Sequence, residues 1–285
     1  MVIEIKNIPG AEVRAGMDRR SFLAKLAVLT GGTAAVAAVL PAGEAGGTSA
    51  QTIPKDDPRL ETAYIEYPGE TGKVRAYSAR PKGAKKLAGV LVVHENRGLN
   101  PWVEDVARRV ALEGYHAIAP DALTPLGGTP ADPDQARSLI QKLDAAANIK
   151  NFVAAAAYLK TGPQATGKVA CMGFCWGGGV TNQVAVNDPG LDAAVPFYGL
   201  QPAAGDVPKI KAALLSHYAG DDQRIDAGIP AFEEALKRSG VKYEIHMYEG
   251  AKHAFMNDTG TNYNKEAATL AWKRTVAFFK KELKS

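Results

Sequence analysis

Apolar runs alternate with amphipathic segments along the chain from about residue 60 to its end. Residues 88–95 read AGVLVVHE, a nearly continuous apolar run that is typical of a strand covered on both faces. Residues 62–81 predict a β-hairpin around a glycine-containing turn. Further apolar runs predict strands at 115–121, 168–174, 192–199, 212–220 and 243–250.

Segments with helical spacing lie between these runs. Residues 101–114 carry Val103, Val106 and Val110 three or four positions apart and end at Gly114, the pattern of an amphipathic helix and its stop. Further helices are predicted over most of 134–160 and at 177–187, 229–240 and 265–284. Because strands and helices alternate to the end of the chain, the sequence predicts an α/β fold with one doubly wound, mostly parallel sheet and helices on both faces.

The first fifty residues differ from the rest. Paired Arg19 and Arg20 precede a stretch rich in alanine and glycine, and the local sequence D-R-R-S-F-L resembles a twin-arginine export signal. We expect residues 1–50 to be an export signal and disordered linker, and residues 51–285 to form one folded domain. The alternative interpretation is an amphipathic or disordered N-terminal arm.

The export interpretation has consequences for compartment and partners. The signal would be recognised by the export machinery, cleavage would follow Ala45 or Ala50, and the mature protein would be periplasmic or secreted. The apolar stretch is too rich in alanine and glycine to predict a stable membrane anchor.

The composition is that of an ordinary globular protein. The 285 residues are 46% hydrophobic and 22% charged, which is enough apolar material for a sizeable core. The net charge of +4 is small, and the charges are dispersed along the chain. Neither nucleic acid nor an acidic membrane surface is therefore an expected partner.

The chain has two cysteines, Cys171 and Cys175. In a strand, four residues at roughly 3.3 Å each place their Cα atoms about 13 Å apart, whereas a disulfide needs about 7 Å or less. Both thiols are therefore expected to be free, even in an oxidising compartment. Cys171 is interpreted as a core residue, and Cys175 lies where the strand ends.

Cys175 is the centre of a glycine-rich motif, GFCWGGG at residues 173–179. The pattern G-x-C-x-G has the form of the nucleophile elbow G-x-S-x-G with sulfur in place of oxygen. The small flanking residues allow a strained turn that exposes the side chain. The N-terminus of the following helix would lower the thiol pKa and offer N–H groups to an oxyanion. The alternative is a buried structural cysteine in a glycine-rich turn.

Two later segments supply partners for such a nucleophile. His253 follows the last predicted strand, where an α/β-hydrolase carries its general base, and Asp221 and Asp222 follow the strand before it. The order Cys175, then Asp221 or Asp222, then His253 is the nucleophile–acid–base order of that fold. The alternative is that His253 is an ordinary surface histidine.

The segment HENRG, residues 94–98, overlaps the end of the apolar run at 88–95. Its position is that of the loop that supplies one oxyanion N–H group in α/β-hydrolases. Glu95 is unexpected there, because a carboxylate repels developing negative charge. It either pairs with Arg97 or Arg109 or touches the nucleophile.

No cofactor is predicted. Position 98 is glycine, so the H-E-x-x-H metal motif is incomplete, and no other cluster has metal-ligand spacing. The glycines at 177–179 complete neither a dinucleotide fingerprint nor a phosphate loop. We therefore expect no metal and no cofactor.

Together, the segments GFCWGGG, HENRG, AGDDQRID and HAFMN resemble the dienelactone hydrolase family, the carboxymethylenebutenolidases. The resemblance covers about residues 60–283 and implies the α/β-hydrolase fold. It also implies an enzyme that opens small enol-lactones or cleaves small carboxylic esters through a Cys-His-Asp triad and an acyl-enzyme. By position, Cys175 is the implied nucleophile, His253 the base and Asp222 the acid.

The same resemblance implies roles for the residues around the triad. Glu95 falls on the family's gating glutamate, and the backbone N–H groups of Asn96 and Trp176 fall on its oxyanion donors. The family's type enzyme has an arginine four residues after the catalytic histidine, which binds the substrate carboxylate, and this chain has Asn257 there. The candidate stand-ins for that arginine are Arg97, Arg137 and Arg224.

A carboxylate beside Cys175 also has a physical rationale. A thiolate in an oxidising compartment is oxidised readily. An ionised Glu95 close to the sulfur would raise the thiol pKa and keep the resting group as S–H.

Two classes of function fit these residues. The first is a cysteine hydrolase that acts on a small ester or lactone. The second is an exported α/β-fold binding protein, or a redox thiol protein, whose Cys175 forms adducts without efficient turnover.

Overall fold

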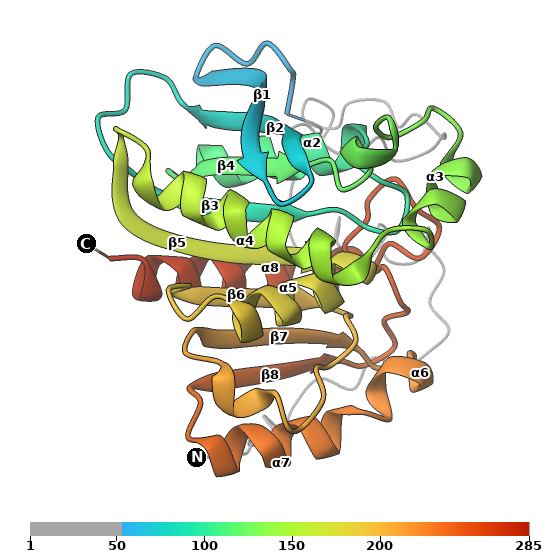
Figure 1. Cartoon of the computed structure of the whole chain (residues 1–285). Helices are drawn as coiled ribbons and strands as arrows, with labels where there is room; N and C mark the ends of the chain where they lie inside the picture. Colours follow the sequence, from blue (N-terminus) through green and yellow to red (C-terminus); the bar gives the residue numbers. More distant parts are fainter. Residues whose placement is uncertain (1–52, 285) are drawn as a thin grey trace, which may run out of the picture. The chain divides into compact units, whose positions relative to one another are not determined.

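The computed structural model describes residues 53–284, so the predicted export signal and linker at 1–50 lie outside the described residues. An eight-stranded sheet runs through this part of the chain in the order β1-β2-β4-β3-β5-β6-β7-β8 (Figure 1). The strands are β1 (Leu60–Gly69), β2 (Gly72–Pro81), β3 (Leu87–Val93), β4 (His116–Pro120), β5 (Ala165–Phe174), β6 (Ala193–Phe197), β7 (Ala213–Ala219) and β8 (Tyr243–Tyr248).

The sheet is mostly parallel. β1 and β2 form the predicted hairpin, and β2 pairs antiparallel with β4. The remaining pairs, from β4 through β3, β5, β6 and β7 to β8, are all parallel. The predicted α/β fold is therefore confirmed, with an antiparallel hairpin added at one edge of a parallel sheet.

The helices form two layers, one on each face of the sheet. In Figure 1, α4, α5 and α7 lie in front of the sheet and α2 and α8 lie behind it. The helices are α2 (Pro101–Leu112), α3 (Pro133–Ile140), α4 (Ala145–Thr161), α5 (Trp176–Asn187), α6 (Gln223–Asp226), α7 (Ile229–Ser239) and α8 (Lys265–Glu282), with the 3-10 helices η1 (Thr124–Leu126) and η2 (Val207–Lys209).

The helical segment predicted over 134–160 is divided. α3 ends at Ile140, and α4 begins after Asp144, whose side chain accepts a hydrogen bond from the N–H of Ala147 as an N-cap. A capping aspartate satisfies an N–H group that has no partner within the helix, so it favours a new start over continuation. The break places the α3–α4 connection beside the N-terminus of α5, where it forms one wall of a cavity.

The core consists of two apolar layers. Along β3, Val90 and Val92 belong to the layer beneath α2 and α8, whereas Leu91 and Val93 belong to the layer beneath α4 and α5. Successive strand residues point to opposite faces, so a strand covered on both sides needs apolar residues at every position. Each such side chain contributes roughly 1.5–3 kcal/mol when fully buried.

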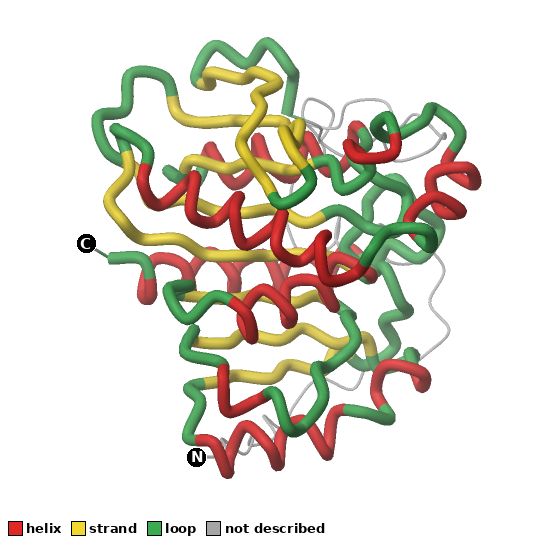
Figure 2. The backbone as a smooth tube through the Cα atoms, viewed as in Figure 1, coloured by secondary structure: helices red, strands yellow, loops and turns green. Residues whose placement is uncertain are grey.

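The sheet gathers the loops that follow its parallel strands at one edge. The segments after β3, β5, β7 and β8 contain Glu95, Cys175, Asp222 and His253, respectively. These loops lie on the right-hand side of the view in Figure 2. Ligand sites in open α/β sheets occur at this carboxyl edge.

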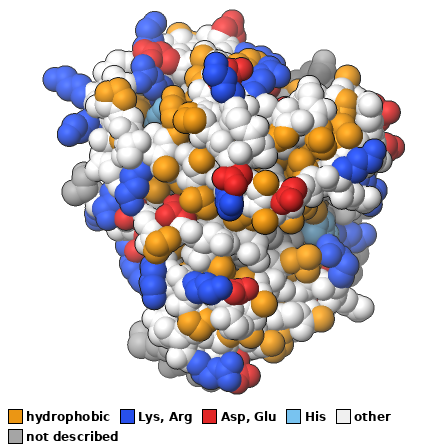
Figure 3. Space-filling model, viewed as in Figure 1, with side chains coloured by type: hydrophobic (Ala, Val, Ile, Leu, Met, Phe, Trp, Pro, Cys, Tyr) orange, Lys and Arg blue, Asp and Glu red, His pale blue; other side chains and the backbone are white. Residues whose placement is uncertain are grey.

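The surface has mixed charge. On the face viewed in Figure 3, Lys and Arg side chains are interspersed with Asp and Glu side chains. Between residues 53 and 284, no helix is long and apolar enough to cross a membrane.

Candidate active site at the carboxyl edge of the sheet

Cys175 occupies a strained turn between β5 and α5. Its φ of 56° and ψ of −115° lie where residues with a side chain are uncommon. The backbone holds this conformation: the N–H of Cys175 donates to Phe197 O at 3.0 Å, and its carbonyl accepts from Gly178 and Gly179. Strain of this kind persists only where the surroundings enforce it, and it is concentrated at functional sites.

The glycines of the G-x-C-x-G motif are required by close backbone contacts. A Cβ atom at Gly173 would lie 2.3 Å from Gly177 O, and one at Gly177 would lie 2.3 Å from His94 O. Both distances are far inside van der Waals contact, so the two positions admit only glycine. The motif thereby lets α5 start directly against the ends of β3 and β5.

His253 and Asp222 come together from the loops after β8 and β7. Nδ1–H of His253 donates to Asp222 Oδ2, and Asn262 Nδ2 donates to the His253 carbonyl at 2.9 Å. His253 is 26% exposed and Asp222 is 8% exposed. With Nδ1 oriented by the carboxylate, Nε2 is left to accept a proton.

The structure separates the two candidate acids. Asp222 is buried against His253, whereas the neighbouring Asp221 is exposed and its N–H donates to Ala251 O at 3.0 Å. Of the two, Asp222 is the one that orients His253.

Glu95 is buried at the end of β3, with 8% of its surface exposed. Its Oε2 accepts a hydrogen bond from Asn257 Nδ2 at 3.0 Å. Arg109, one of the two arginines considered as a partner, instead pairs with Asp105 and Asp258. Arg97 is exposed, and its positive charge lowers the Glu95 pKa only as a minor contribution.

The pKa values of Glu95 and Cys175 are both raised. Burial is the main cause for Glu95, opposed by the Asn257 hydrogen bond and the charge of His253. Burial, followed by the charge of Glu95, raises the pKa of the Cys175 thiol to about 11. The backbone N–H of Trp176 and the charge of Arg224 act in the opposite direction. The helix N-terminus therefore acts in the expected direction, and the raised thiol pKa is the direction expected for a neighbouring Glu95 carboxylate, with burial as the larger cause.

His94 fixes the turn that carries Glu95 and Asn96. Its Nδ1–H donates to Glu95 O at 2.6 Å, and its Nε2 accepts from the N–H of Ala122 at 3.2 Å. Complete burial lowers the His94 pKa, so the ring stays neutral. The Trp176 indole stacks on it with ring centroids 5.2 Å apart.

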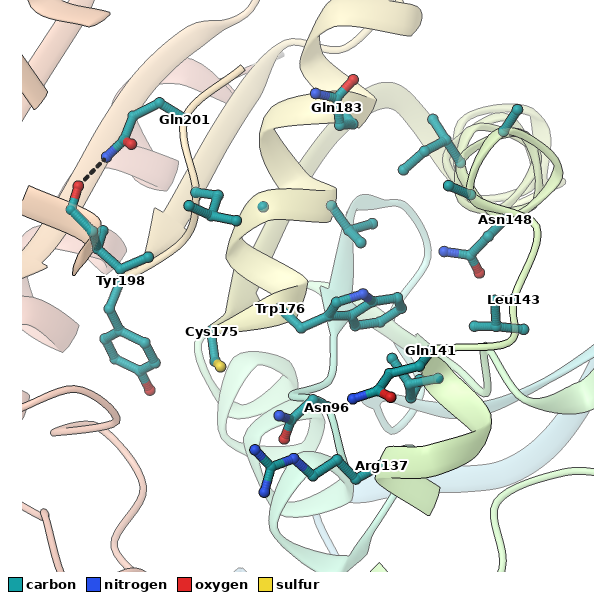
Figure 4. A pocket seen from close by; sticks show the side chains of 18 of the residues that line it. Asn96, Arg137, Gln141, Leu143, Asn148, Cys175, Trp176, Gln183, Tyr198 and Gln201 are labelled. Carbon is teal, nitrogen blue, oxygen red and sulfur yellow. Dashed lines mark hydrogen bonds between the residues drawn. The ribbon is translucent and has the colours of Figure 1, made fainter. Parts of the chain in front are cut away.

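A cavity of about 880 Å³ opens onto Cys175. Asn96 and Trp176 line it beside the sulfur, and Figure 4 shows Arg137 extending from α3 toward Asn96. Arg224 also lines this cavity. Of the four residues predicted to bind substrate, Arg137 and Arg224 therefore lie in the cavity wall. The other two, Arg97 and Asn257, are not among its lining residues.

Tyr198 is a site residue that the sequence reasoning missed. It lies at the end of β6 with a φ of 39°, lines the cavity, and packs its ring on His253 with centroids 5.0 Å apart. Burial, followed by the charge of the neighbouring Glu95, raises the pKa of its hydroxyl well above the ordinary value. Its position in the sequence could have indicated this role, because Tyr198 and Gly199 end an apolar run at the same edge of the sheet as Cys175.

Within the described residues, no group of three or more His, Cys, Asp or Glu side chains could hold a metal ion. The two thiols are free, as the strand geometry predicted.

Comparisons with known proteins show the family to which the chain belongs. The sequence model of the dienelactone hydrolase family matches residues 74–283. A relative from Saccharolobus solfataricus, named "Putative carboxymethylenebutenolidase", is 34% identical over 255 residues, covering 76% of this chain and 97% of the relative.

Solved structures show the same similarity. The crystal structure of a "Putative Dienelactone Hydrolase" from Klebsiella pneumoniae superposes with a TM-score of 0.69 at 28% identity, covering 78% of this chain and 98% of that one. A dienelactone hydrolase-like promiscuous phosphotriesterase from metagenomic libraries gives a TM-score of 0.70 at 25% identity, covering 79% and 100%.

Proposed function

The chain belongs to the dienelactone hydrolase family, and we propose that it hydrolyses lactones or carboxylic esters through a Cys175–His253–Asp222 triad and an acyl-enzyme. The observation that carries this proposal is the strained elbow of Cys175 opening onto a cavity. The hydrogen-bonded pair of His253 and Asp222 at the same edge of the sheet supports it.

The first half of the reaction forms the acyl-enzyme. His253 Nε2 takes the proton of the Cys175 thiol, and the sulfur attacks the carbonyl carbon of the substrate. The backbone N–H groups of Asn96 and Trp176 donate to the resulting oxyanion. The C–O bond to the leaving alcohol then breaks, and His253 returns the proton to the departing oxygen. In a lactone, that oxygen stays tethered to the acyl group.

The second half releases the acid. His253 takes a proton from a water molecule, whose oxygen attacks the thioester carbon. The C–S bond breaks, the proton returns to sulfur, and the carboxylic acid product leaves. Asp222 keeps Nδ1 protonated throughout, so that Nε2 is available as the base.

Glu95 controls the charge on the resting thiol. Its negative charge adds to burial in raising the Cys175 pKa, which keeps the group as S–H and protects it from oxidation. When a substrate enters, displacement or protonation of the carboxylate removes this barrier to thiolate formation.

Arg137 and Arg224 are the proposed contacts for an acidic group on the substrate. Both line the cavity that holds Cys175, and Arg224 is close enough for its charge to lower the thiol pKa. A guanidinium group binds a carboxylate through paired hydrogen bonds. We therefore expect the Arg137→Gln and Arg224→Gln variants to raise KM more for acidic lactones than for neutral ones.

The test of the triad is turnover of a chromogenic acetate ester by the full chain. A burst equal to the enzyme concentration, followed by steady release, supports the acyl-enzyme. Stoichiometric labelling of Cys175 without turnover supports instead the adduct-forming binding or redox protein, and overturns the hydrolase. A panel of small lactones and esters then ranks substrates by kcat/KM.

Export through a twin-arginine signal is a separate proposal, supported by the sequence around Arg19 and Arg20. We expect replacement of both arginines by lysine to leave the protein in the cytoplasm, as measured by cell fractionation. An unchanged location would contradict the export signal and leave the triad untouched.

A further inference from the structure

The three consecutive glycines after Trp176 have different surroundings. A Cβ atom would lie 2.3 Å from His94 O at Gly177 and 2.5 Å from Phe197 O at Gly178. At Gly179 the nearest atoms, all of Leu200, would lie 3.7–3.8 Å away, in ordinary van der Waals contact. Packing therefore explains the first two glycines and leaves the third unexplained.

Gly179 lies in the wall of the cavity that opens onto Cys175. The α5 residues that line this cavity share one helical face and are Trp176, Gly179, Val180, Gln183 and Asn187. At 1.5 Å per residue, this face extends roughly 16 Å from the elbow. Figure 4 shows Cys175 at the start of α5, Gln183 further along it, and Leu143 and Asn148 across the cavity.

The wall opposite α5 is rich in apolar side chains. Ile140 from α3, Leu143 from the α3–α4 connection and Ile149 from α4 contribute to it. Leu200, which follows β6 and adjoins Gly179, is 55% exposed, although exposing a large apolar side chain is unfavourable. Such a lining offers burial to an apolar chain that begins at the reacting carbonyl group.

From these contacts we propose that Gly179 is a specificity-determining residue, and that the protein acts on esters or lactones bearing a long apolar substituent that lies along α5. A side chain at position 179 would fill the channel about one helical turn beyond Cys175. Glycine keeps it open. This inference rests on the proposed function and adds the substrate class.

The first test is a series of 4-nitrophenyl esters from acetate to octanoate. Complete burial of one methylene group is worth ~0.8 kcal/mol, or roughly fourfold in kcat/KM. We expect kcat/KM to be at least about tenfold higher for octanoate than for acetate. A decline with chain length would overturn the proposal.

The Gly179→Leu variant tests the position itself. Leucine favours helix more than glycine does, and space for its Cβ exists, so the variant should fold; its thermal midpoint is measured alongside. We expect the ratio of octanoate to acetate kcat/KM to fall at least about tenfold. The matched Gly179→Ala variant, with a much smaller side chain, should keep most of the ratio. Equal ratios in all three proteins would overturn the role of Gly179.

A binding measurement separates the channel from the chemistry. Decanamide, a neutral apolar amide, is titrated by calorimetry into Cys175→Ala and into the double variant with Gly179→Leu. The channel predicts at least about tenfold weaker binding to the double variant. If decanamide binding depends on Gly179 but the parent protein turns over no ester, the proposed hydrolase is refuted and the channel is supported. Turnover that favours acetate, without decanamide binding, would refute the channel and keep the hydrolase.

Discussion

Cysteine and histidine side chains occur both in the middle of the sheet and at its carboxyl edge, and the two regions hold them differently. Cys171, in the middle of β5, is fully buried and donates to Thr181 Oγ1 at 3.5 Å. Burial raises its pKa to about 12. Cys175, at the end of the same strand, lies on a strained turn at a cavity.

The histidines show the same contrast. His217 in β7 uses both ring nitrogens: Nδ1 accepts from the Tyr248 hydroxyl at 2.9 Å, and Nε2–H donates to Thr275 Oγ1 at 3.1 Å. The Thr275 hydroxyl donates to Ala271 O at 2.9 Å, and complete burial holds the His217 pKa well below its ordinary value. In His253, Asp222 orients Nδ1, which leaves Nε2 as the candidate base.

The difference lies in how completely each polar group is satisfied. In the middle of the sheet, neighbouring strands and helices supply a partner for each ring nitrogen, which fixes one neutral state. At the edge, Glu95 and Tyr198 are buried beside each other, and the charge of Glu95 adds to burial in raising the Tyr198 pKa. His94 lies at the same edge with a partner for each ring nitrogen. A position at the edge together with an uncommitted Nε2, rather than residue type, therefore distinguishes His253 as the candidate base.

The largest expected effect comes from replacing each of the two cysteines by alanine. Cys175→Ala should lower kcat by roughly 10⁵- to 10⁶-fold, as loss of a nucleophile does in a serine hydrolase. Cys171→Ala should keep kcat within about threefold and lose about 1 kcal/mol of the free energy of unfolding. Steady-state kinetics measures kcat, and urea titration measures the free energy of unfolding. Full activity of Cys175→Ala would contradict a catalytic difference between the two cysteines.

The next effect concerns the acid. Asp222→Asn should reduce kcat by roughly 10⁴-fold, because His253 loses the partner that fixes its tautomer. The exposed neighbour provides the control, and Asp221→Asn should change kcat by less than about threefold. Losses of similar size in both variants would leave the assignment of Asp222 without support.

Glu95→Gln sharpens the comparison between the two thiols. Removal of the charge should lower the Cys175 pKa, although burial still holds it above the ordinary value. Inactivation by peroxide should become faster and turnover slower, by about tenfold each. Thiolate absorbance against pH, measured in a Cys171→Ala background, reports one sulfur only. A higher thiol pKa together with greater resistance to peroxide would show that Glu95 does not gate the cysteine.

The smallest effect is on stability and comes from the middle of the sheet. Because the His217 pKa is lowered in the fold, the unfolded chain binds more protons below about pH 6.5. The stability contributed by neutral His217 is therefore present above that pH and is lost as the pH falls. His217→Gln should lower the free energy of unfolding by about 1–2 kcal/mol at neutral pH. On acidification, its free energy of unfolding should fall less than that of the parent, as measured by urea titration at several pH values.

His116 supplies a second test of the same linkage. Burial lowers its pKa to about 4, and it contacts Ser78 Oγ at 3.0 Å. The His116→Gln variant should likewise show a shallower fall in the free energy of unfolding between neutral pH and about pH 5. If the free energy of unfolding depended on pH equally in the parent and in both variants, neither buried histidine would contribute to acid destabilisation.

The sequence by itself predicted the strands of the sheet and most of the helices, although the helical segment predicted over 134–160 is two helices. Apolar runs predicted the core strands, and the G-x-C-x-G motif, the position of His253 and the chain order of the acid predicted the candidate site. These features depend on residues near one another in the chain, because side-chain periodicity and backbone turns are local properties. A sheet of parallel strands then brings their carboxyl ends together whatever the details of packing.

Tertiary structure decided what depends on neighbours distant in sequence. It hydrogen-bonded Asp222, the acid that the family resemblance implies, to His253, placed the Asn257 amide on Glu95, and brought Tyr198 to His253. It also made burial, ahead of the charge of Glu95, the largest cause of the raised Cys175 pKa. The desolvation of the Cys175 sulfur depends on atoms from several strands and helices, so its effect on the pKa cannot be predicted from the residues next to Cys175 in the sequence. The cavity along α5 exists for the same reason, since its walls meet only when α3, α4 and α5 pack on one side of the sheet.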